Sequence, residues 1–406
     1  MISSMQEFLR PPRGMTWALG ALTAMGAAAI DCYLPSLPAI DQELVTGSIT
    51  AQHTLSAFFL GLAIGQLFYG PLSDRFGRRR VMFIGVSLYI LASLACAFAS
   101  SIELLLMGRF LQALAAGVGA VIGRAVVRDL YRMDQAAQAQ SFIQMVFLIT
   151  PLLAPTIGGY IMLWFDWRAI FVVLAVFGGL CLLALITQIP ETLPVERRQP
   201  LNPRAVLHAY GQVLRHRRSM GAILTSAFAF ACMFTYFAES ALVFTRVYDV
   251  AAEDYGLLFA LNVIGLMVTN FINIRLVARV GALTMLLIGA IMVWAGAMAL
   301  VATAATGFGN LWGLVLPLIL VVGSLGLVGA NAAAAALEPF GKRAGTAASL
   351  QGFIQMAIGA AAATIVGFFH DGSALPMALT IAGLASLGLV CRLFLVGLKL
   401  PEKPAS

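Results

Sequence analysis

The chain is dominated by continuous apolar runs of about 20 residues, which is the length a helix needs to cross about 30 Å of hydrocarbon. A membrane β-barrel would instead show alternating segments of about ten residues. With 61% hydrophobic residues, 11% charged residues and a mean hydropathy of +0.92, we expect an all-α membrane protein with twelve transmembrane helices. These runs lie near residues 15–35, 53–72, 81–100, 103–124, 140–162, 168–189, 220–245, 255–276, 282–304, 311–336, 346–368 and 375–397.

The net charge of +7 is distributed unevenly along the chain. Arginine and lysine gather before the first run, in alternate connections and after the last run, whereas the other connections hold mostly aspartate and glutamate. The positive-inside rule then predicts that both termini and the central link face the cytoplasm of a bacterial inner membrane. This pattern indicates a lipid bilayer as partner and argues against nucleic acid. A cleaved signal peptide is the alternative for the first run, but it would leave an odd number of spans.

One long polar segment, "PETLPVERRQPLNPRAVLHAYGQVLRHRRSM", divides the runs into six and six. We therefore expect an N-terminal six-helix bundle at 1–190, a cytoplasmic linker at 191–218 and a C-terminal six-helix bundle at 219–406. An internal repeat supports pseudo-two-fold symmetry, since Asp31 precedes Asp41 by ten residues and Glu239 precedes Asp249 by ten. Inside the linker, apolar residues at helical spacing predict an amphipathic helix on the inner membrane surface. They are Val206, Leu207, Tyr210, Val213 and Leu214.

The sharpest local motif is "GPLSDRFGRRRV", Gly70 to Val81. It resembles the loop between the second and third spans of the major facilitator superfamily, G-x-L-[A/S]-D-x-x-G-R-[K/R]-[K/R]. Its glycines suit close packing and a tight turn, and its aspartate suits arginine partners. The alternative is a basic loop that only sets the orientation of the chain in the membrane. It explains the arginines but not the glycines or the aspartate. The resemblance implies a cytoplasmic gate made of Gly70, Asp74, Arg75, Gly77, Arg78, Arg128 and Asp129.

Two further motifs resemble the same superfamily. In "GRFLQALAAGVGA", Arg109 and Gln112 match a signature linked to coupling in proton-driven members, with Ala113 at a position where glycine is usual. In "ITPLLAPTIGGYI", Pro155, Gly158 and Gly159 match an element of antiporter helix 5, and such small residues allow close helix packing. With "IDCYLPSLPAI", "VRDLY" and "DWRAIF", the chain resembles the Bcr/CflA branch of drug:proton antiporters. Within that branch it is most similar to bicyclomycin resistance proteins.

Charged residues inside apolar runs usually line transport pathways. Asp31 and Arg109 both fall in the outer half of their spans, so they could meet, and the pair need not be a direct contact. A substrate that changes their separation would shift proton occupancy. A permanent pair that only orders the bundle is the alternative. Glu239 is a second candidate for proton coupling, unless it snorkels to the outer surface or pairs with Arg246. The expected substrate-binding residues are Asp31, Tyr33, Arg109, Gln112, Tyr236 and Glu239.

These features, with the resemblance, predict a proton-coupled multidrug efflux transporter that exports small antibiotics of the bicyclomycin, phenicol or sulfonamide type by alternating access. A proton-coupled exporter of a metabolite, such as an amino acid or nucleoside, is the alternative. An enzyme is not expected, because the sequence has no nucleotide-binding loop and no nucleophile motif. The scattered histidines and cysteines suggest no metal site. We expect a monomer that needs no cofactor besides the coupling proton.

Overall fold

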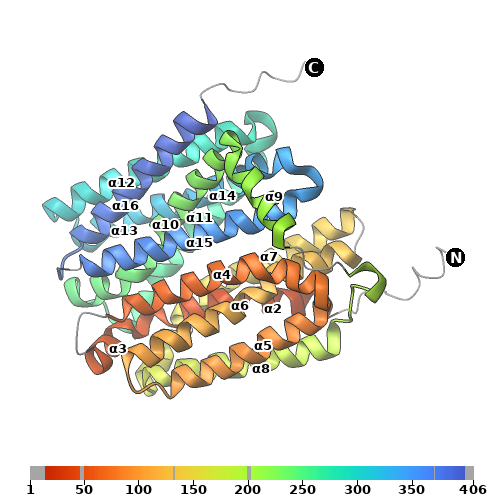
Figure 1. Ribbon diagram of the computed structural model, residues 1–406. Coiled ribbons are helices and arrows are strands. Elements are labelled where there is room, and N and C mark those ends of the chain that lie inside the picture. The colour runs from red at the N-terminus through yellow and green to blue at the C-terminus, as the bar shows by residue number, and fades with distance from the viewer. Residues whose placement is uncertain (1–13, 46–49, 131–132, 199–202, 370, 398–406) are drawn as a thin grey trace.

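The computed structural model describes residues 14–45, 50–130, 133–198, 203–369 and 371–397. Its helices include twelve that are long and apolar enough to cross a membrane, so the predicted all-α architecture with twelve spans is confirmed. Figure 1 shows two groups of helices, one from the first part of the chain, in red to yellow, and one from the second part, in green to blue. The two groups lie side by side, with α4 packed along α15 and α7 along α11.

The first group begins with a span that is interrupted near its middle. Helix α2 ends at Asp31. Pro35 in the short turn η1 and Pro38 in the first turn of α3 follow it, and neither can donate a backbone hydrogen bond. This break places Asp31 at a helix end and not inside a continuous helix. The elements of this group are α2 (Met15–Asp31), η1 (Leu34–Ser36), α3 (Leu37–Leu44), α4 (Gln52–Phe76), α5 (Arg78–Ala97), α6 (Ile102–Leu130), α7 (Met133–Trp164) and α8 (Trp167–Gln188).

The second group repeats the pattern with its own interruptions. The span that starts with α10 ends in η3, a short π-helix, and the fourth span of the group is divided between α13 and α14. Its elements are α10 (Arg217–Leu242), η3 (Val243–Val247), α11 (Ala252–Val280), α12 (Ala282–Thr306), α13 (Asn310–Gly323), α14 (Leu325–Leu337), η4 (Glu338–Arg343), α15 (Ala344–Phe368), α16 (Leu375–Cys391) and η5 (Arg392–Val396).

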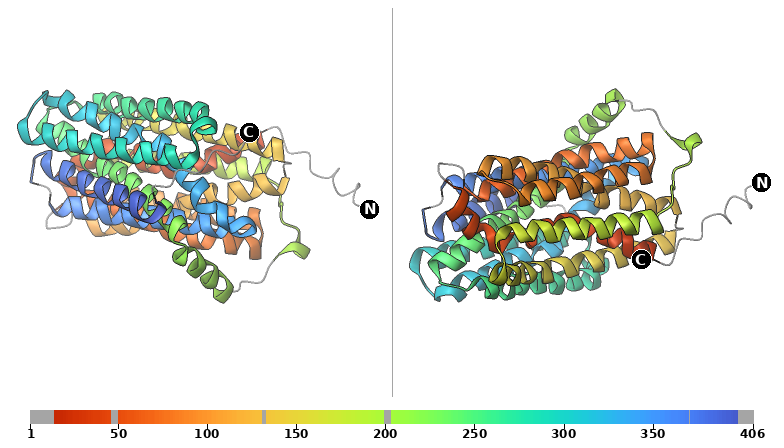
Figure 2. Two further views of the ribbon diagram at one scale, coloured as in Figure 1. Left: turned by 90° about the horizontal axis from the view of Figure 1, so that it is seen from above. Right: turned by 90° about the horizontal axis from the view of Figure 1, so that it is seen from below.

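Between the groups lies α9 (Pro203–Arg215), seen at one end of the helices in Figure 2. We call this the linker end and the opposite one the far end. The hydroxyl of Tyr210 donates to the carbonyl of Leu67 in α4, at 3.4 Å. That carbonyl lacks its usual helical donor because Pro71 stands four residues later. Since α9 also packs on α10 and α15, it connects both groups at the linker end.

The predicted linker helix is confirmed as α9, while its place on the inner membrane surface remains a prediction. Val213 is buried, and Tyr210 is half-buried where α9 contacts the bundle. Leu207 and Leu214 are exposed instead. The apolar residues of α9 therefore divide between the bundle and the exterior, because the helix lies against the ends of other helices.

Candidate functional site

Asp31 lies in the interface between the two groups of helices. Its side chain is only 2% exposed, and it is close enough to interact electrostatically with the phenol groups of Tyr236 and Tyr255, on α10 and α11. Among the described residues, no arginine, lysine or histidine forms an ion pair with it. A carboxylate buried in this way is costly unless it is paired or neutralised by a proton.

Arg109 is fully buried in α6 and is held between aromatic rings. Its guanidinium carbon lies 4.3 Å from the ring centroid of Tyr33 and 4.2 Å from that of Phe58, with Phe171 at 5.8 Å. The faces of such rings are negative and attract a desolvated cation by about 2 kcal/mol each. These rings, and not a carboxylate, are therefore the surroundings that stabilise the positive charge of Arg109.

Two hydrogen bonds of Nη1 fix the orientation of the Arg109 guanidinium. Its Nη1 donates to the carbonyl of Ala29, at 2.9 Å, and to Oε1 of Gln112, at 2.7 Å. Gln112 in turn donates to the hydroxyl of Ser93, at 2.8 Å. Nε and Nη2 of Arg109 have no hydrogen-bond partner in the described part of the chain. Arg109 and Gln112, one helical turn apart, are therefore in direct contact, and the N–H groups of Nε and Nη2 remain available to another group.

Asp31 and Arg109 do not form an ion pair with each other in this structure. Arg109 reaches α2, but it binds the backbone oxygen of Ala29, two residues before Asp31. Asp31 ends α2 and lies within electrostatic range of Tyr236 and Tyr255 in the second group. The alternative of a permanent Asp31–Arg109 pair is therefore wrong for this conformation, although their roles in coupling remain predictions.

Glu239 lies on the other side of the interface and is 1% exposed, so the idea that it snorkels to the surface is wrong. Its Oε1 accepts a hydrogen bond from Nε2 of Gln52 in the first group, at 3.4 Å. Arg246, which the sequence offered as a partner for Glu239, pairs with Asp41. Glu239 thus joins the two groups through a neutral partner.

A network of neutral polar groups surrounds these carboxylates in the second group. Tyr236 accepts a hydrogen bond from Asn262, at 3.1 Å, and the hydroxyls of Ser240 and Tyr255 lie 2.8 Å apart. In the first group, the hydroxyls of Tyr33 and Thr54 lie 2.7 Å apart. The sequence interpretation missed Gln52, Thr54, Ser240 and Tyr255. Their signal, a lone polar side chain at a span end, is too common to single them out.

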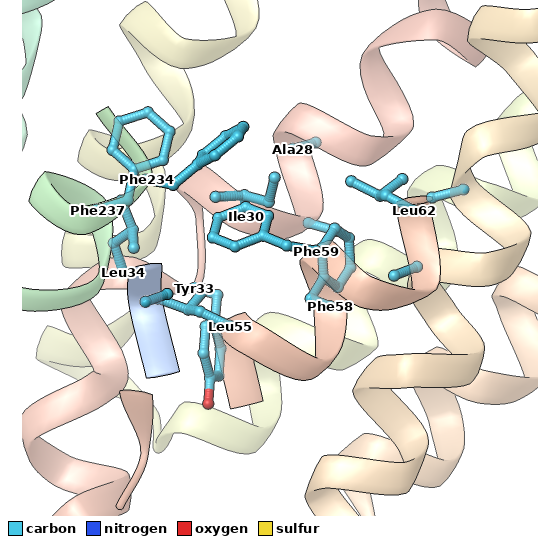
Figure 3. Packing of buried hydrophobic residues seen from close by; sticks show 14 of the residues in the cluster. Ala28, Ile30, Tyr33, Leu34, Leu55, Phe58, Phe59, Leu62, Phe234 and Phe237 are labelled. Carbon is cyan, nitrogen blue, oxygen red and sulfur yellow. The ribbon is translucent and has the colours of Figure 1, made fainter. Parts of the chain in front are cut away.

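Apolar and aromatic side chains fill the region between the two groups, as Figure 3 shows for Phe58 and Phe59 on one side and Phe234 and Phe237 on the other. The ring centroids of Phe59 and Phe234 lie 4.2 Å apart across the interface. Tyr33 follows directly after α2, on the same segment as Asp31. The interface therefore combines two buried carboxylates with aromatic surface, and the cation of Arg109 lies inside the first group behind Tyr33 and Phe58. Apolar walls with a few polar groups are the composition expected of a small-molecule site.

At the linker end, Arg78 organises the predicted gate motif. It forms ion pairs with Asp74, at 2.6 Å, and with Asp129, at 3.2 Å. Its backbone N–H also donates to Glu191, at 2.9 Å. The tight turn expected at Gly77 is confirmed, because this residue adopts φ +96°. Asp74 and Asp129 belong to the first group, and Glu191 lies at the start of the linker.

Three other residues of the predicted gate, Gly70, Arg75 and Arg128, do not take part in this set of ion pairs. The expectation of close packing at Gly70 is wrong, since a Cβ placed there would meet nothing within 4 Å. Arg75 and Arg128 are exposed. Nη1 of Arg128 lies 3.9 Å from the position that a Cβ on Gly345 would occupy, so it approaches α15 of the second group. A latch between the groups remains a prediction for these residues.

The helix 5 motif lies directly against the segment that carries Asp31. A Cβ on Gly158 would overlap the carbonyl group of Cys32, so glycine is required where α7 crosses the end of α2. Pro155 and Gly159 are buried in the same helix. The predicted close helix packing is confirmed at Gly158, where α7 contacts Cys32, the residue next to Asp31.

Comparisons with known proteins agree with these motifs. Residues 17–364 match the family model of the Major Facilitator Superfamily. The chain is 32% identical to the bicyclomycin resistance protein homolog of Haemophilus influenzae, over 95% of this chain and 96% of that protein. It is 30% identical to multidrug resistance protein D of Escherichia coli, over 82% of this chain and 83% of that protein. A crystal structure of a D-xylose-proton symporter has the same fold, with a TM-score of 0.71 and 16% sequence identity. The match covers 94% of this chain and 96% of the symporter.

Proposed function

Because the chain belongs to the major facilitator superfamily, we propose that it is a proton-coupled efflux transporter that exports small antibiotics of the bicyclomycin, phenicol or sulfonamide type. The family is one of multi-pass membrane transporters, and the protein is not an enzyme. Its relatives at about this identity include proteins named for bicyclomycin resistance and multidrug resistance. Their names favour drug export over the export of a metabolite.

The observation that carries the coupling proposal is the burial of Asp31 at the interface without a described cationic partner. A carboxylate costs far more to bury there than a neutral carboxyl group. Proton binding at Asp31 and closure of the interface around it are therefore linked. A drug that enters the interface from the cytoplasmic side and disturbs the surroundings of Asp31 changes this balance, which is the requirement for exchanging a proton against a drug.

Arg109 has a separate role in this proposal. Its charge is already stabilised by aromatic rings, and the N–H groups of its Nε and Nη2 face no described acceptor. Those donors suit a carbonyl or hydroxyl oxygen of a substrate, since the drugs in question are largely uncharged and rich in such groups. Gln112 holds the guanidinium in place. Tyr33 and Tyr236 offer aromatic surface on opposite sides of the interface.

The orientation follows from the arginine-rich linker end, which we place in the cytoplasm of a bacterial inner membrane. The far end then faces outward. Ion pairs of Arg78 with Asp74 and Asp129 stabilise the first bundle at the cytoplasmic end, and Arg75 and Arg128 complete a gate with the second bundle. The two bundles, 1–190 and 219–406, rock about the interface as a monomer.

The test is proton exchange in liposomes with an acidic lumen, monitored by a pH-sensitive dye trapped inside. Drug added outside is taken up by inside-out molecules in exchange for lumenal protons, so bicyclomycin or a phenicol should raise the lumenal pH. Asp31→Asn should abolish this response. Asp249→Asn is the matched control, because Asp249 is an exposed aspartate with φ +52° that asparagine also adopts readily.

The outcomes separate the hypotheses. A response that persists in Asp31→Asn assigns the coupling proton to another group, with Glu239 the first candidate. No response to any drug in the wild type, together with a response to an amino acid or nucleoside, replaces drug export by metabolite export.

A further inference from the structure

A buried arginine at the linker end of the second group has no described counter-ion. Arg392 is the first residue of η5 and is 1% exposed. Its Nη1 donates to the carbonyl of Gly397, at 2.8 Å, and its Nη2 to that of Leu283, at 2.7 Å. Its Nε is buried and has no hydrogen-bond partner. Neutral carbonyls orient this guanidinium but do not cancel its charge.

Two further arginines lie beside it at the start of α10. Nη2 of Arg217 donates to the carbonyl of Phe394, two residues after Arg392, at 2.7 Å. Arg218 is close enough to repel Arg392 electrostatically. Within the described ranges, none of the three forms an ion pair with a carboxylate. Such a cluster is stable when an anion from outside the protein balances it.

The surface next to the arginines is apolar. Leu387, Val390 and Phe394 are all exposed, Phe394 to 68%, and their spacing of three and four residues places them along one side of the last span. This stripe ends at the carbonyl that Arg217 binds. A ligand that fits both features has a long apolar part and one anionic group at its end.

We propose that Arg217, Arg218 and Arg392 bind the phosphate of an anionic phospholipid, whose acyl chain lies along Leu387, Val390 and Phe394. The exposed guanidinium groups of Arg217 and Arg218 contact the phosphate, because arginine binds this group with paired hydrogen bonds. Arg392 supplies a fixed charge behind them. The site lies outside the transport interface and does not depend on which substrate is exported.

Thermal unfolding of the purified protein in detergent tests this site. Phosphatidylglycerol should raise the midpoint by about 3 °C or more above phosphatidylcholine with the same acyl chains, as expected for a ligand that binds only the folded state. Arg217→Gln/Arg218→Gln should lose at least half of that difference. Both residues are exposed, so the variant should fold. Arg275→Gln/Arg279→Gln is the matched control, since these arginines are exposed on α11 at the same end.

Three results would overturn the proposal. The first is an equal effect of phosphatidylglycerol on wild type and Arg217→Gln/Arg218→Gln. The second is an equal loss in the α11 control, which would indicate a general charge effect. The third is an equal rise caused by inorganic phosphate alone, which would assign the cluster to a free anion and not to a lipid.

Discussion

Arg246 and Asp41 form an ion pair of 3.0 Å that joins the two halves of the molecule at the far end. Asp41 belongs to α3, and Arg246 belongs to η3. The carboxylate of Asp41 also accepts a hydrogen bond from the backbone N–H of Ala51, at 3.2 Å, so one partner of the pair is held in place. With the contact between Gln52 and Glu239, this pair closes the interface on the side away from the linker.

Removal of this pair should favour opening of the far end. Arg246→Gln should make Cys32, which is buried beside Asp31, react faster with a hydrophilic thiol reagent, as followed by mass spectrometry of the labelled peptide. The pair is partly exposed and contributes about 0.5–1 kcal/mol, so we expect a two- to fivefold increase in rate.

The double variant Asp41→Arg/Arg246→Asp restores the pair with reversed charges and should return the labelling rate toward that of the wild type. If the reversed pair reacts as fast as Arg246→Gln, the contact does not control access to Cys32.

The sequence predicted those features that depend on neighbours along the chain. The apolar runs predicted the twelve spans, the glycine before three arginines predicted the turn at Gly77, and the apolar spacing in the linker predicted the helix α9. Each of these depends on helix length, backbone conformation or helical periodicity. All three are local properties.

Features that depend on how helices rotate against each other were not predictable. Arg109 binds Ala29 and stacks on Phe58, and Asp41 pairs with Arg246, although these partners are far apart in sequence. Their positions in the outer halves of two spans suggested that Arg109 and Asp31 could meet. The guanidinium of Arg109 is instead surrounded by the carbonyl of Ala29 near the end of α2 and by aromatic rings.

Phe58 should stabilise Arg109 through its ring and not only by filling space. A double-mutant cycle of Phe58→Leu with Arg109→Met should give a coupling energy of about 2 kcal/mol, the size of a desolvated cation–π contact. Unfolding in detergent by increasing denaturant provides the free energies. Phe59→Leu is the control, since Phe59 stacks on Phe234. Equal coupling in both cycles would contradict a specific contact with Phe58.

Gly158 should tolerate no larger side chain, because α7 contacts the carbonyl of Cys32 there. Gly158→Ala should lower the free energy of unfolding by about 1–3 kcal/mol, as overpacking does. Gly179→Ala is the matched control in α8, where a Cβ meets nothing within 4 Å, and it should leave stability unchanged or raise it by less than about 1 kcal/mol. Equal effects of the two substitutions would show that α7 moves away from Cys32 at little cost.

The hydrogen bond from Tyr210 to Leu67 should hold α9 against the first half of the molecule. Tyr210→Phe keeps the ring but leaves the carbonyl freed by Pro71 without a donor, which weakens the contact by about 0.5–1.5 kcal/mol. Spin labels can be attached at the exposed positions Leu207 on α9 and Phe68 on α4, in a variant without its native cysteines. Pulsed electron paramagnetic resonance should then give a broader distribution of the distance between the two labels. Tyr160→Phe, at an exposed tyrosine of α7, should leave the distribution unchanged. An unchanged distribution in Tyr210→Phe would mean that packing of Val213 alone fixes α9, and that the linker helix does not need this hydrogen bond to connect the two halves.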